Sequence, residues 1–348
     1  MNAVTLDAYL TAFEAEGRPL RPAIAETVRQ LAQAAVTLRL ALSHGVLGPA
    51  FAGTRGTNAD GDRQLDLDIL ADNLFLDAMR TAPVALYASE ERAEPALLAK
   101  EAPLALALDP LDGSSGVEAN APVGSIFSIL PALPAPESDP TASFLQPGAN
   151  QLAAGFFIFG PQLALVLTLG GGTRIFVHSA GRGSFVQAYA SRAIPPRTQE
   201  FAINASNYRH WDEAVRLYVD DCLKGAEGPR GKDFNMRWVA SLVAECYRIL
   251  IRGGVFLYPG DERRGYHQGR LRIVYEANPI AFLIEQAGGA ATDTVGRILD
   301  IAPNALHQRT PLVFGSAREV ERIARYHTAP SSIGERAPLF GHRGLFRA

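Results

Sequence analysis

An apolar run that ends in two aspartates constrains the fold of this chain more than any other segment. Residues 104–108 read Leu-Ala-Leu-Ala-Leu, and Asp109 and Pro110 follow directly. A short apolar run of this length is typical of a strand buried in a sheet, and the residue before a proline favours extended backbone. The sequence therefore predicts a buried strand that delivers Asp109 at its carboxyl end.

The seven residues that begin at Asp109 read Asp-Pro-Leu-Asp-Gly-Ser-Ser and predict a site for a metal ion and a phosphate. Asp109 and Asp112 can face one point across a turn that proline stiffens. Their carboxylates and the carbonyl of Leu111 are hard oxygen ligands of the kind that Mg²⁺ takes. The glycine and two serines offer unhindered N–H groups and hydroxyls, which suit phosphate oxygens. A surface turn also uses Asp-Gly, but the buried strand before the motif favours the binding site.

Charge is unevenly distributed along a chain whose formal net charge is only -3. Residues 60–118 hold 13 acidic against 4 basic residues, whereas residues 229–272 hold 9 basic against 4 acidic. Most charge runs are solvated surface, but Asp66 and Asp68 lie between apolar residues, and Glu90 and Glu91 follow an apolar run. Buried carboxylates are costly unless they are paired or bind a cation. We therefore expect the acidic part to hold metal and the basic part an anion.

The composition is that of an ordinary globular protein. With 348 residues, 47% of them hydrophobic, the chain is long enough for two domains or one large α/β unit, and its composition excludes disorder. The small net charge gives no sign of a nucleic-acid-binding surface. The two cysteines, Cys222 and Cys246, match neither a disulfide framework nor a metal-ligand spacing. Because the first residues also lack a secretory signal pattern, we expect a cytoplasmic protein.

Residues 150–173 contain no charged side chain, but they do not predict a membrane span. Gly160 and Pro161 interrupt the segment, and a spanning helix needs about 20 continuous apolar residues. The segment is better interpreted as two buried strands, at 156–159 and 163–169, joined by a turn.

Apolar periodicity and chain-breaking residues predict the other elements. Helices are expected at residues 24–42, 66–81, 212–223, 238–252 and 279–286. A final helix is expected to begin with a capping box formed by Ser316 and Glu319. Further strands are expected at residues 124–130, 255–258 and 271–275.

Five motifs, in their order along the chain, resemble the class 1 fructose-1,6-bisphosphatase family: GDRQLDLDIL, SEE, DPLDGSS, LYP and GRLRIVYEANPIAFLIEQAGG. The resemblance spans roughly residues 23–326. It implies the layered α/β/α/β/α fold of the lithium-sensitive, metal-dependent phosphatase superfamily. It also implies two tightly packed halves: residues 1–200 with the metal-binding acids, and residues 201–348 with the pocket for a sugar 6-phosphate.

The activity that the resemblance implies is Mg²⁺-dependent hydrolysis of D-fructose 1,6-bisphosphate to D-fructose 6-phosphate and phosphate, in gluconeogenesis or the Calvin cycle. It implies two or more Mg²⁺ ions per subunit, with Mn²⁺ as an alternative, because two metals can clamp the attacking and leaving oxygens. The implied partners are a sugar bisphosphate and further copies of the chain in a cytoplasmic homotetramer, without nucleic acid or membrane.

The family's functional positions can be carried over residue by residue. The implied metal ligands are Glu90, Asp109, the carbonyl of Leu111, Asp112 and Glu276, with Asp62 helping to hold a further ion. Asp68 and Glu91 resemble the pair that orients and deprotonates the attacking water. The implied cradle for the 1-phosphate consists of Asp112, Gly113, Ser114 and Ser115. The implied pocket for the sugar and its 6-phosphate consists of Asn204, Tyr208, Tyr258 and Arg270, with Arg237 reaching in from a neighbouring subunit.

Three positions depart from the family pattern. Arg270 stands where the family usually has Lys, Trp238 where it has Tyr, and Gly116 where it has Asn. None of these changes removes a metal ligand, but they leave sugar specificity open. The alternatives are activity on sedoheptulose 1,7-bisphosphate, alone or in addition, and a non-catalytic sugar-phosphate-binding regulator; the second would require missing acids, and every expected ligand is present.

Overall fold

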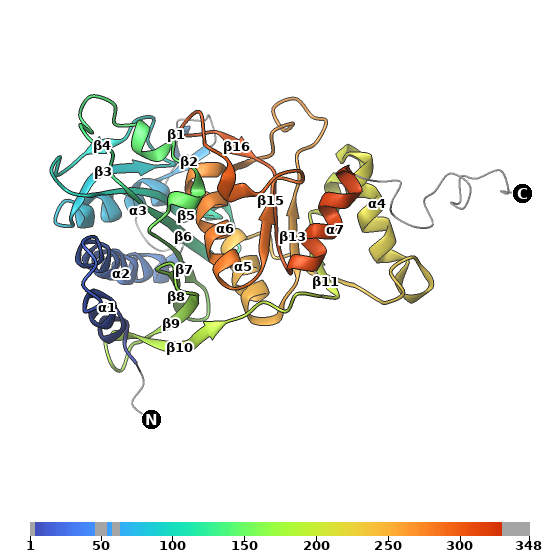
Figure 1. Ribbon diagram of the computed structural model, residues 1–348, viewed down its shortest axis with the longest axis horizontal. Helices are drawn as coiled ribbons and strands as arrows, with labels where there is room; N and C mark the ends of the chain where they lie inside the picture. Colours follow the sequence, from blue (N-terminus) through green and yellow to red (C-terminus); the bar gives the residue numbers. More distant parts are fainter. Residues whose placement is uncertain (1–3, 46–53, 58–62, 329–348) are drawn as a thin grey trace, which may run out of the picture.

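Two β-sheets divide the molecule into five alternating layers of helix and strand (Figure 1). The computed structural model describes residues 4–45, 54–57 and 63–328, which are the residues discussed below. The first layer contains α1 (Leu6–Glu14), α2 (Arg21–Ser43) and α3 (Asp66–Met79). The central layer contains α5 (Leu242–Arg252) and α6 (Asn278–Gln286), and the last contains α4 (Glu213–Leu223) and α7 (Ala317–Thr328). The layered α/β/α/β/α fold expected from the sequence is confirmed.

The first sheet has eight strands in the order β10-β9-β8-β7-β6-β5-β3-β4. Only the β3–β5 pair is parallel; the other neighbours are antiparallel. Helices cover both faces, so its central strands are buried on both sides and their sequences are mostly apolar. The strands are β3 (Val84–Ser89), β4 (Ala96–Leu97), β5 (Leu104–Asp112), β6 (Val123–Pro131), β7 (Ala153–Phe159), β8 (Leu163–Thr168), β9 (Thr173–Ser179) and β10 (Ser184–Arg192).

The second sheet has five strands in the order β12-β11-β13-β17-β15. They are β11 (Glu200–Ala202), β12 (Asn235–Met236), β13 (Val255–Tyr258), β15 (Ala290–Thr292) and β17 (Leu312–Gly315). Two strand pairs lie outside both sheets: β1 (Thr54–Thr57) with β2 (Arg63–Leu65), and β14 (Leu271–Arg272) with β16 (Arg309–Thr310). Single short helical turns are η3 (Ser114–Gly116), η4 (Ala142–Phe144), η5 (Gly148–Asn150), η6 (Ala205–His210), η7 (Gly225–Glu227) and η9 (Ile298–Asp300).

Three apolar clusters hold the layers together. One lies between the sheets around α5 and α6, one lies between the first sheet and α1 to α3, and one lies between the second sheet and α4 and α7. The uncharged segment 150–173 forms the antiparallel β7–β8 hairpin, as its central Gly-Pro predicted. None of the helices in the described part of the chain has the length and apolar character that a membrane span needs.

Three local predictions were wrong, and each error has a physical cause. The helix expected from residue 238 begins at Leu242, because Ser241 caps it through the Ala244 N–H and Ala240 has φ 61°. The strand expected at 271–275 ends at Arg272, where the π-helical turn η8 (Ile273–Ala277) begins and leads into α6.

The expected capping box at α7 was also wrong, because both of its side chains bind other partners. Ser316 Oγ accepts a hydrogen bond from the Gly254 N–H at 3.3 Å, and Glu319 forms an ion pair with Arg230 at 2.7 Å. The second contact is buried and joins α7 to the chain between α4 and β12.

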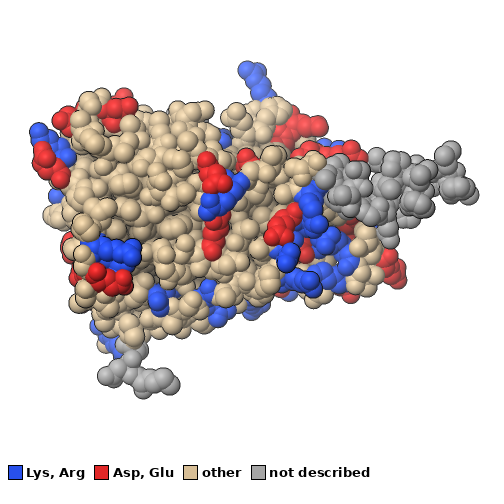
Figure 2. All heavy atoms as spheres, viewed as in Figure 1, with Lys and Arg blue, Asp and Glu red and all other residues tan. Residues whose placement is uncertain are grey.

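Several acidic side chains of the first half are buried, whereas basic side chains are prominent on the surface of the second. Asp68, Asp72 and Asp109 are each only 4% exposed. Figure 2 shows basic side chains gathered on one face around α7, with acidic ones among them. The uneven charge of the sequence is therefore partly a difference between interior and surface.

Candidate active site

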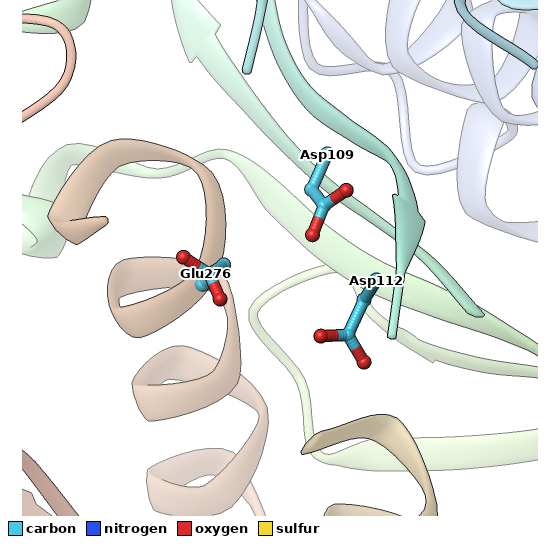
Figure 3. Close-up of side chains that lie close together, drawn as sticks. All are labelled: Asp109, Asp112 and Glu276. Atoms are coloured by element: carbon cyan, nitrogen blue, oxygen red, sulfur yellow. The ribbon is translucent and has the colours of Figure 1, made fainter. Parts of the chain in front are cut away.

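Three carboxylates from two separate segments converge between the first sheet and the central helices (Figure 3). Asp109 and Asp112 lie on β5, and Glu276 lies on η8, directly before α6. One oxygen of each carboxylate lies within 4.8 Å of the others, and within the described ranges this is the one group of this kind. The cluster unites the Asp-Pro-Leu-Asp motif with the glutamate of the Tyr-Glu-Ala-Asn-Pro motif.

The end of β5 is shaped so that its two aspartates reach the same space. The register between β5 and β6 shifts between Asp109 and Asp112, where Pro110 interrupts regular pairing. The Asp109 carboxylate accepts a hydrogen bond from the Leu111 N–H at 3.0 Å, and Ser125 Oγ donates one to the Pro110 carbonyl at 2.7 Å. These bonds hold the irregular strand end in place without a regular ladder.

The electrostatics of the cluster favour a bound cation. Burial raises the pKa of Asp109 well above its ordinary value, and the charges of Glu90, Asp112, Glu276 and Glu91 raise it further. Burial and the charge of Glu90 likewise raise the pKa of Glu276, and burial raises the pKa of Asp112 to about 7. A divalent cation would offset both burial and mutual repulsion, and oxygen ligands alone suit a hard ion such as Mg²⁺. The residues present therefore fit a metal site.

Arg272 is a member of this site that the sequence analysis did not single out. Its guanidinium lies 2.7 Å from Glu90 Oε1, and its backbone N–H donates to Glu276 Oε2 at 2.6 Å. The residue is 8% exposed, so its charge lies inside the protein beside the acids. The sequence hinted at Arg272 only through its position, four residues before Glu276 in a segment with excess basic charge. It could not show the ion pair, because the partner, Glu90, is distant along the chain.

The predicted water-activating pair comes from two different elements. Asp68 lies in the first turn of α3 and is 4% exposed. Glu91 lies in the turn after β3, where its N–H donates to Ser89 Oγ at 3.2 Å, and its charge contributes to the raised pKa of Asp109. The remaining predicted metal ligand, Asp62, lies outside the described residues.

The predicted phosphate cradle begins where β5 ends. Gly113 has φ 76°, a left-handed conformation that glycine adopts without strain, and η3 follows it. The carboxylate of Asp112 accepts a hydrogen bond from the Val243 N–H at 3.3 Å, in the first turn of α5. The cradle therefore lies near the amino end of a helix, where N–H groups and the helix dipole favour an anion.

Two of the predicted sugar-pocket residues lie together, near the carboxylate cluster. Tyr258 ends β13, and its ring stacks in parallel on Phe256 and on Trp238, with centroid distances of 6.0 and 6.3 Å. Burial raises the pKa of Tyr258, an effect that the charge of Arg270 opposes and the charge of Glu276 reinforces. The Arg270 guanidinium lies 4.7 Å from the centroid of the Tyr266 ring, which contacts Arg263 as well.

The other three predicted pocket residues bind local partners in this chain. The Asn204 side chain accepts hydrogen bonds from both the N–H and the hydroxyl of Ser206. Tyr208 is 41% exposed and donates to Asp220 on α4 at 2.9 Å. Arg237 follows β12, an edge strand of the second sheet, and its Nε lies 3.5 Å from Glu200. Its side chain is 51% exposed.

Comparisons with known proteins agree with this fold. Two family models, described as Fructose-1-6-bisphosphatase N-terminal domain and C-terminal domain, match residues 13–190 and 194–328. A class 1 fructose-1,6-bisphosphatase of Rhizobium meliloti is 64% identical over the full length of both chains, and one of Sinorhizobium medicae is 61% identical. The holo crystal structure of fructose-1,6-bisphosphatase from Leishmania major has a TM-score of 0.86 and 28% identity, covering 94% of this chain and all of that one.

The layered fold and these matches define a phosphatase, an enzyme of the hydrolase class. More narrowly, the chain belongs to the fructose-1,6-bisphosphatase family, which confirms the resemblance found in the sequence.

Proposed function

We propose that this enzyme hydrolyses the 1-phosphate of D-fructose 1,6-bisphosphate in a reaction that depends on Mg²⁺, giving D-fructose 6-phosphate and phosphate. The observation that carries the proposal is the cluster of Asp109, Asp112 and Glu276 beside the Gly-Ser-Ser turn, in a chain whose relatives bear that enzyme's name. Phosphate monoesters hydrolyse extremely slowly without a catalyst. The site must therefore accelerate the reaction greatly, and concentrating charge around the phosphoryl group is one way to do so.

The proposed metal ligands are Glu90, Asp109, the carbonyl of Leu111, Asp112 and Glu276, with Asp62 near a further ion. Two or more Mg²⁺ ions, or Mn²⁺ in their place, would neutralise the phosphoryl charge and polarise its oxygens. Glu90 also forms an ion pair with Arg272, whose guanidinium lies 2.7 Å from the Glu90 carboxylate. This contact supports a ligand set in which one carboxylate is also held by a fixed positive group.

In the proposed reaction, Asp68 and Glu91 orient a water molecule, and Glu91 accepts its proton as the oxygen attacks phosphorus. The cradle of Asp112, Gly113, Ser114 and Ser115 holds the 1-phosphate through N–H groups and hydroxyls. The sugar oxygen then leaves with its electron pair and takes up a proton. General base catalysis of this kind contributes typically about 10²–10⁴-fold to a rate.

The proposed pocket for the sugar and its 6-phosphate contains Tyr258 and Arg270, with Asn204 and Tyr208 at its edge and Arg237 supplied by a neighbouring subunit. The role of Arg237 requires at least a dimer, and from the family resemblance we infer a homotetramer that acts in the cytoplasm without nucleic acid or membrane partners. Residues 1–200 would supply the metal-binding acids and residues 201–348 the sugar pocket of one functional unit. The product suits gluconeogenesis or the Calvin cycle.

A phosphate-release assay tests the proposal. The enzyme is supplied with Mg²⁺ and with fructose 1,6-bisphosphate, sedoheptulose 1,7-bisphosphate or fructose 6-phosphate, and an Asp109→Asn variant is the matched control. We expect release of one phosphate from fructose 1,6-bisphosphate, none from fructose 6-phosphate and none with the variant. Faster turnover of the seven-carbon substrate would correct the sugar assignment, and no release from either bisphosphate would contradict the proposal.

A further inference from the structure

An ion pair that is buried on its acidic side joins the two elements that carry Asp68 and Glu91. The guanidinium of Arg92, in the turn after β3, lies 2.6 Å from Asp72 Oδ2 on α3. Its Nε donates to the same carboxylate oxygen at 2.7 Å, and the terminal nitrogen that contacts Asp72 also donates to Asn73 Oδ1 at 3.2 Å. Asp72 is almost fully buried, since 5% of its side chain is exposed.

The position of the pair relates it directly to the proposed catalytic residues. Asp72 lies four residues after Asp68, and residues at this spacing share one face of a helix, one turn apart. Arg92 is the residue immediately after Glu91. The contact therefore fixes the separation between the helix that carries one carboxylate and the turn that carries the other.

Both partners are themselves held by further bonds. The Tyr87 hydroxyl, fully buried on β3, donates to Asp72 Oδ1 at 2.9 Å. The backbone carbonyl of Arg92 lies 3.0 Å from His307 Nε2. The turn is bonded to β5 as well, because the Glu90 N–H donates to the Leu108 carbonyl at 3.1 Å. These contacts tie the Glu90–Glu91 turn and the residue after it to β5, to His307 and, through the Arg92 side chain, to α3.

We propose that the Asp72–Arg92 ion pair is a positioning element that sets the distance between Asp68 and Glu91 and thereby the turnover rate. This inference rests on the proposed function, because it takes those two carboxylates as the pair that activates water. Arg92 contacts Asp72, Asn73 and His307, and Asp72 also contacts Tyr87. None of these partners is a proposed catalytic or metal-binding residue, so the ion pair would influence the reaction by positioning Asp68 and Glu91. Reacting groups misplaced by about 1 Å can lose about 100-fold in rate.

The first test is the Arg92→Met variant, which keeps an unbranched apolar stem and removes the charged, planar guanidinium. We expect kcat to fall about 10- to 100-fold, while KM for fructose 1,6-bisphosphate stays within about twofold of the unmodified enzyme because the sugar pocket is untouched. Asp72→Asn, which keeps a hydrogen-bonding group for Tyr87, should lower kcat in the same direction by less. It serves as the second variant if Arg92→Met does not fold.

The matched control is Arg297→Met, which removes an arginine that forms a comparable ion pair, 2.6 Å from Glu285, between α6 and the segment after β15. This variant should keep kcat within about twofold, because the pair joins neither α3 nor the Glu90–Glu91 turn. Melting temperatures of all variants show how much each fold is weakened.

A double-mutant cycle separates positioning from general weakening. If Arg92 acts through Glu91, adding Arg92→Met to Glu91→Gln lowers kcat little beyond Glu91→Gln alone. The role of the ion pair would be overturned if the fold-reductions in kcat of the two single variants multiplied in the double mutant. It would also be overturned if kcat were unchanged in both Arg92→Met and Asp72→Asn while Glu91→Gln was impaired. Full turnover in Glu91→Gln itself would instead remove the proposed catalytic pair, and this proposal with it.

Discussion

The two ends of the proposed active site hold charge in opposite ways. At the metal end, Asp109 and Glu276 are each 4% exposed, and burial beside other acids raises their pKa values well above the ordinary range. At the sugar end, Arg270 and Arg237 are exposed to solvent. Buried like charges are costly without a counter-ion, whereas exposed charges are not. We therefore expect the metal end to depend on a bound cation for both stability and reaction, and the sugar end to contribute mainly to binding.

The largest expected effect tests the metal end. Asp109→Asn and Asp112→Asn should each lower turnover by at least about 1,000-fold, equivalent to about 4 kcal/mol in the barrier, because an amide supplies no charge to offset a cation. Phosphate release measures the loss. Both chelated variants should melt at or above the temperature of the chelated unmodified enzyme, since a buried amide costs less than a buried charge. Near-normal turnover in either variant would show that the reaction does not require the carboxylate charge at the metal end.

The next effect sharpens the role of the sugar end. Arg270→Ala should raise KM for fructose 1,6-bisphosphate about 10- to 100-fold, because a charge-assisted hydrogen bond contributes about 1.5–3 kcal/mol, and should leave kcat within a few-fold. Arg270→Lys should raise KM less, since it keeps the charge but loses the planar group that stacks on Tyr266. Fructose 1-phosphate, which lacks the distal phosphate, is the control substrate. A fall in kcat with unchanged KM would place Arg270 at the metal end.

A smaller effect tests whether the sugar end is completed by another copy of the chain. Arg237→Ala and Asp109→Asn chains, each impaired alone, should regain measurable phosphatase activity when mixed oligomers form. In such oligomers an intact arginine and an intact carboxylate cluster can meet across one interface. Each variant refolded separately is the control. No recovery in oligomers shown to be mixed would mean that Arg237 acts within its own subunit or not at all.

The smallest expected effect is a contribution of the metal end to the pH dependence of stability. Asp112 has a pKa of about 7 in the folded chain, above its ordinary value near 3.8. Between these values the folded state binds the proton more tightly than the unfolded state does, so the free energy of unfolding of the chelated enzyme should fall as pH rises from about 4 to about 7. Denaturant titration at several pH values measures this slope.

The control for the pH experiment is Asp112→Asn, in which the fall should be smaller because the titrating group is absent. Added Mg²⁺ should also oppose the fall in the unmodified enzyme, since it binds the ionised carboxylates of the folded state. The same slope in both proteins would mean that Asp112 does not carry the raised pKa.

Local sequence patterns were sufficient for individual strands and for one side of the site, whereas the layered fold came from the family resemblance. The apolar run before Asp109 predicted β5, and the Gly-Pro break predicted the β7–β8 hairpin. Each signal lies within a few neighbouring residues. The family resemblance added Glu276, whose carboxylate lies 167 positions along the chain from Asp109 and meets it in the cluster.

Features that depend on distant partners could not be predicted from local patterns. In the sequence, Arg272 is not distinguishable from the other basic residues of its segment. Its role is evident only in the folded chain, where it pairs with Glu90. The π-helical turn η8 begins directly after Arg272, whose N–H donates to the Glu276 carboxylate, and periodicity encodes neither feature. In the sequence, Arg92 and Asp72 likewise resemble separate surface charges, although the fold pairs them and buries Asp72.

Direct metal binding tests the central claim, that the buried carboxylates form a cation site. The chelated enzyme and its Asp109→Asn variant are titrated with Mn²⁺, and free ion is followed by electron paramagnetic resonance. We expect the unmodified chain to bind Mn²⁺ without substrate, to bind it more weakly below pH 7 where protons compete for the carboxylates, and to lose at least one ion in the variant. Equal binding by both proteins would contradict the assignment of the cluster as the metal site.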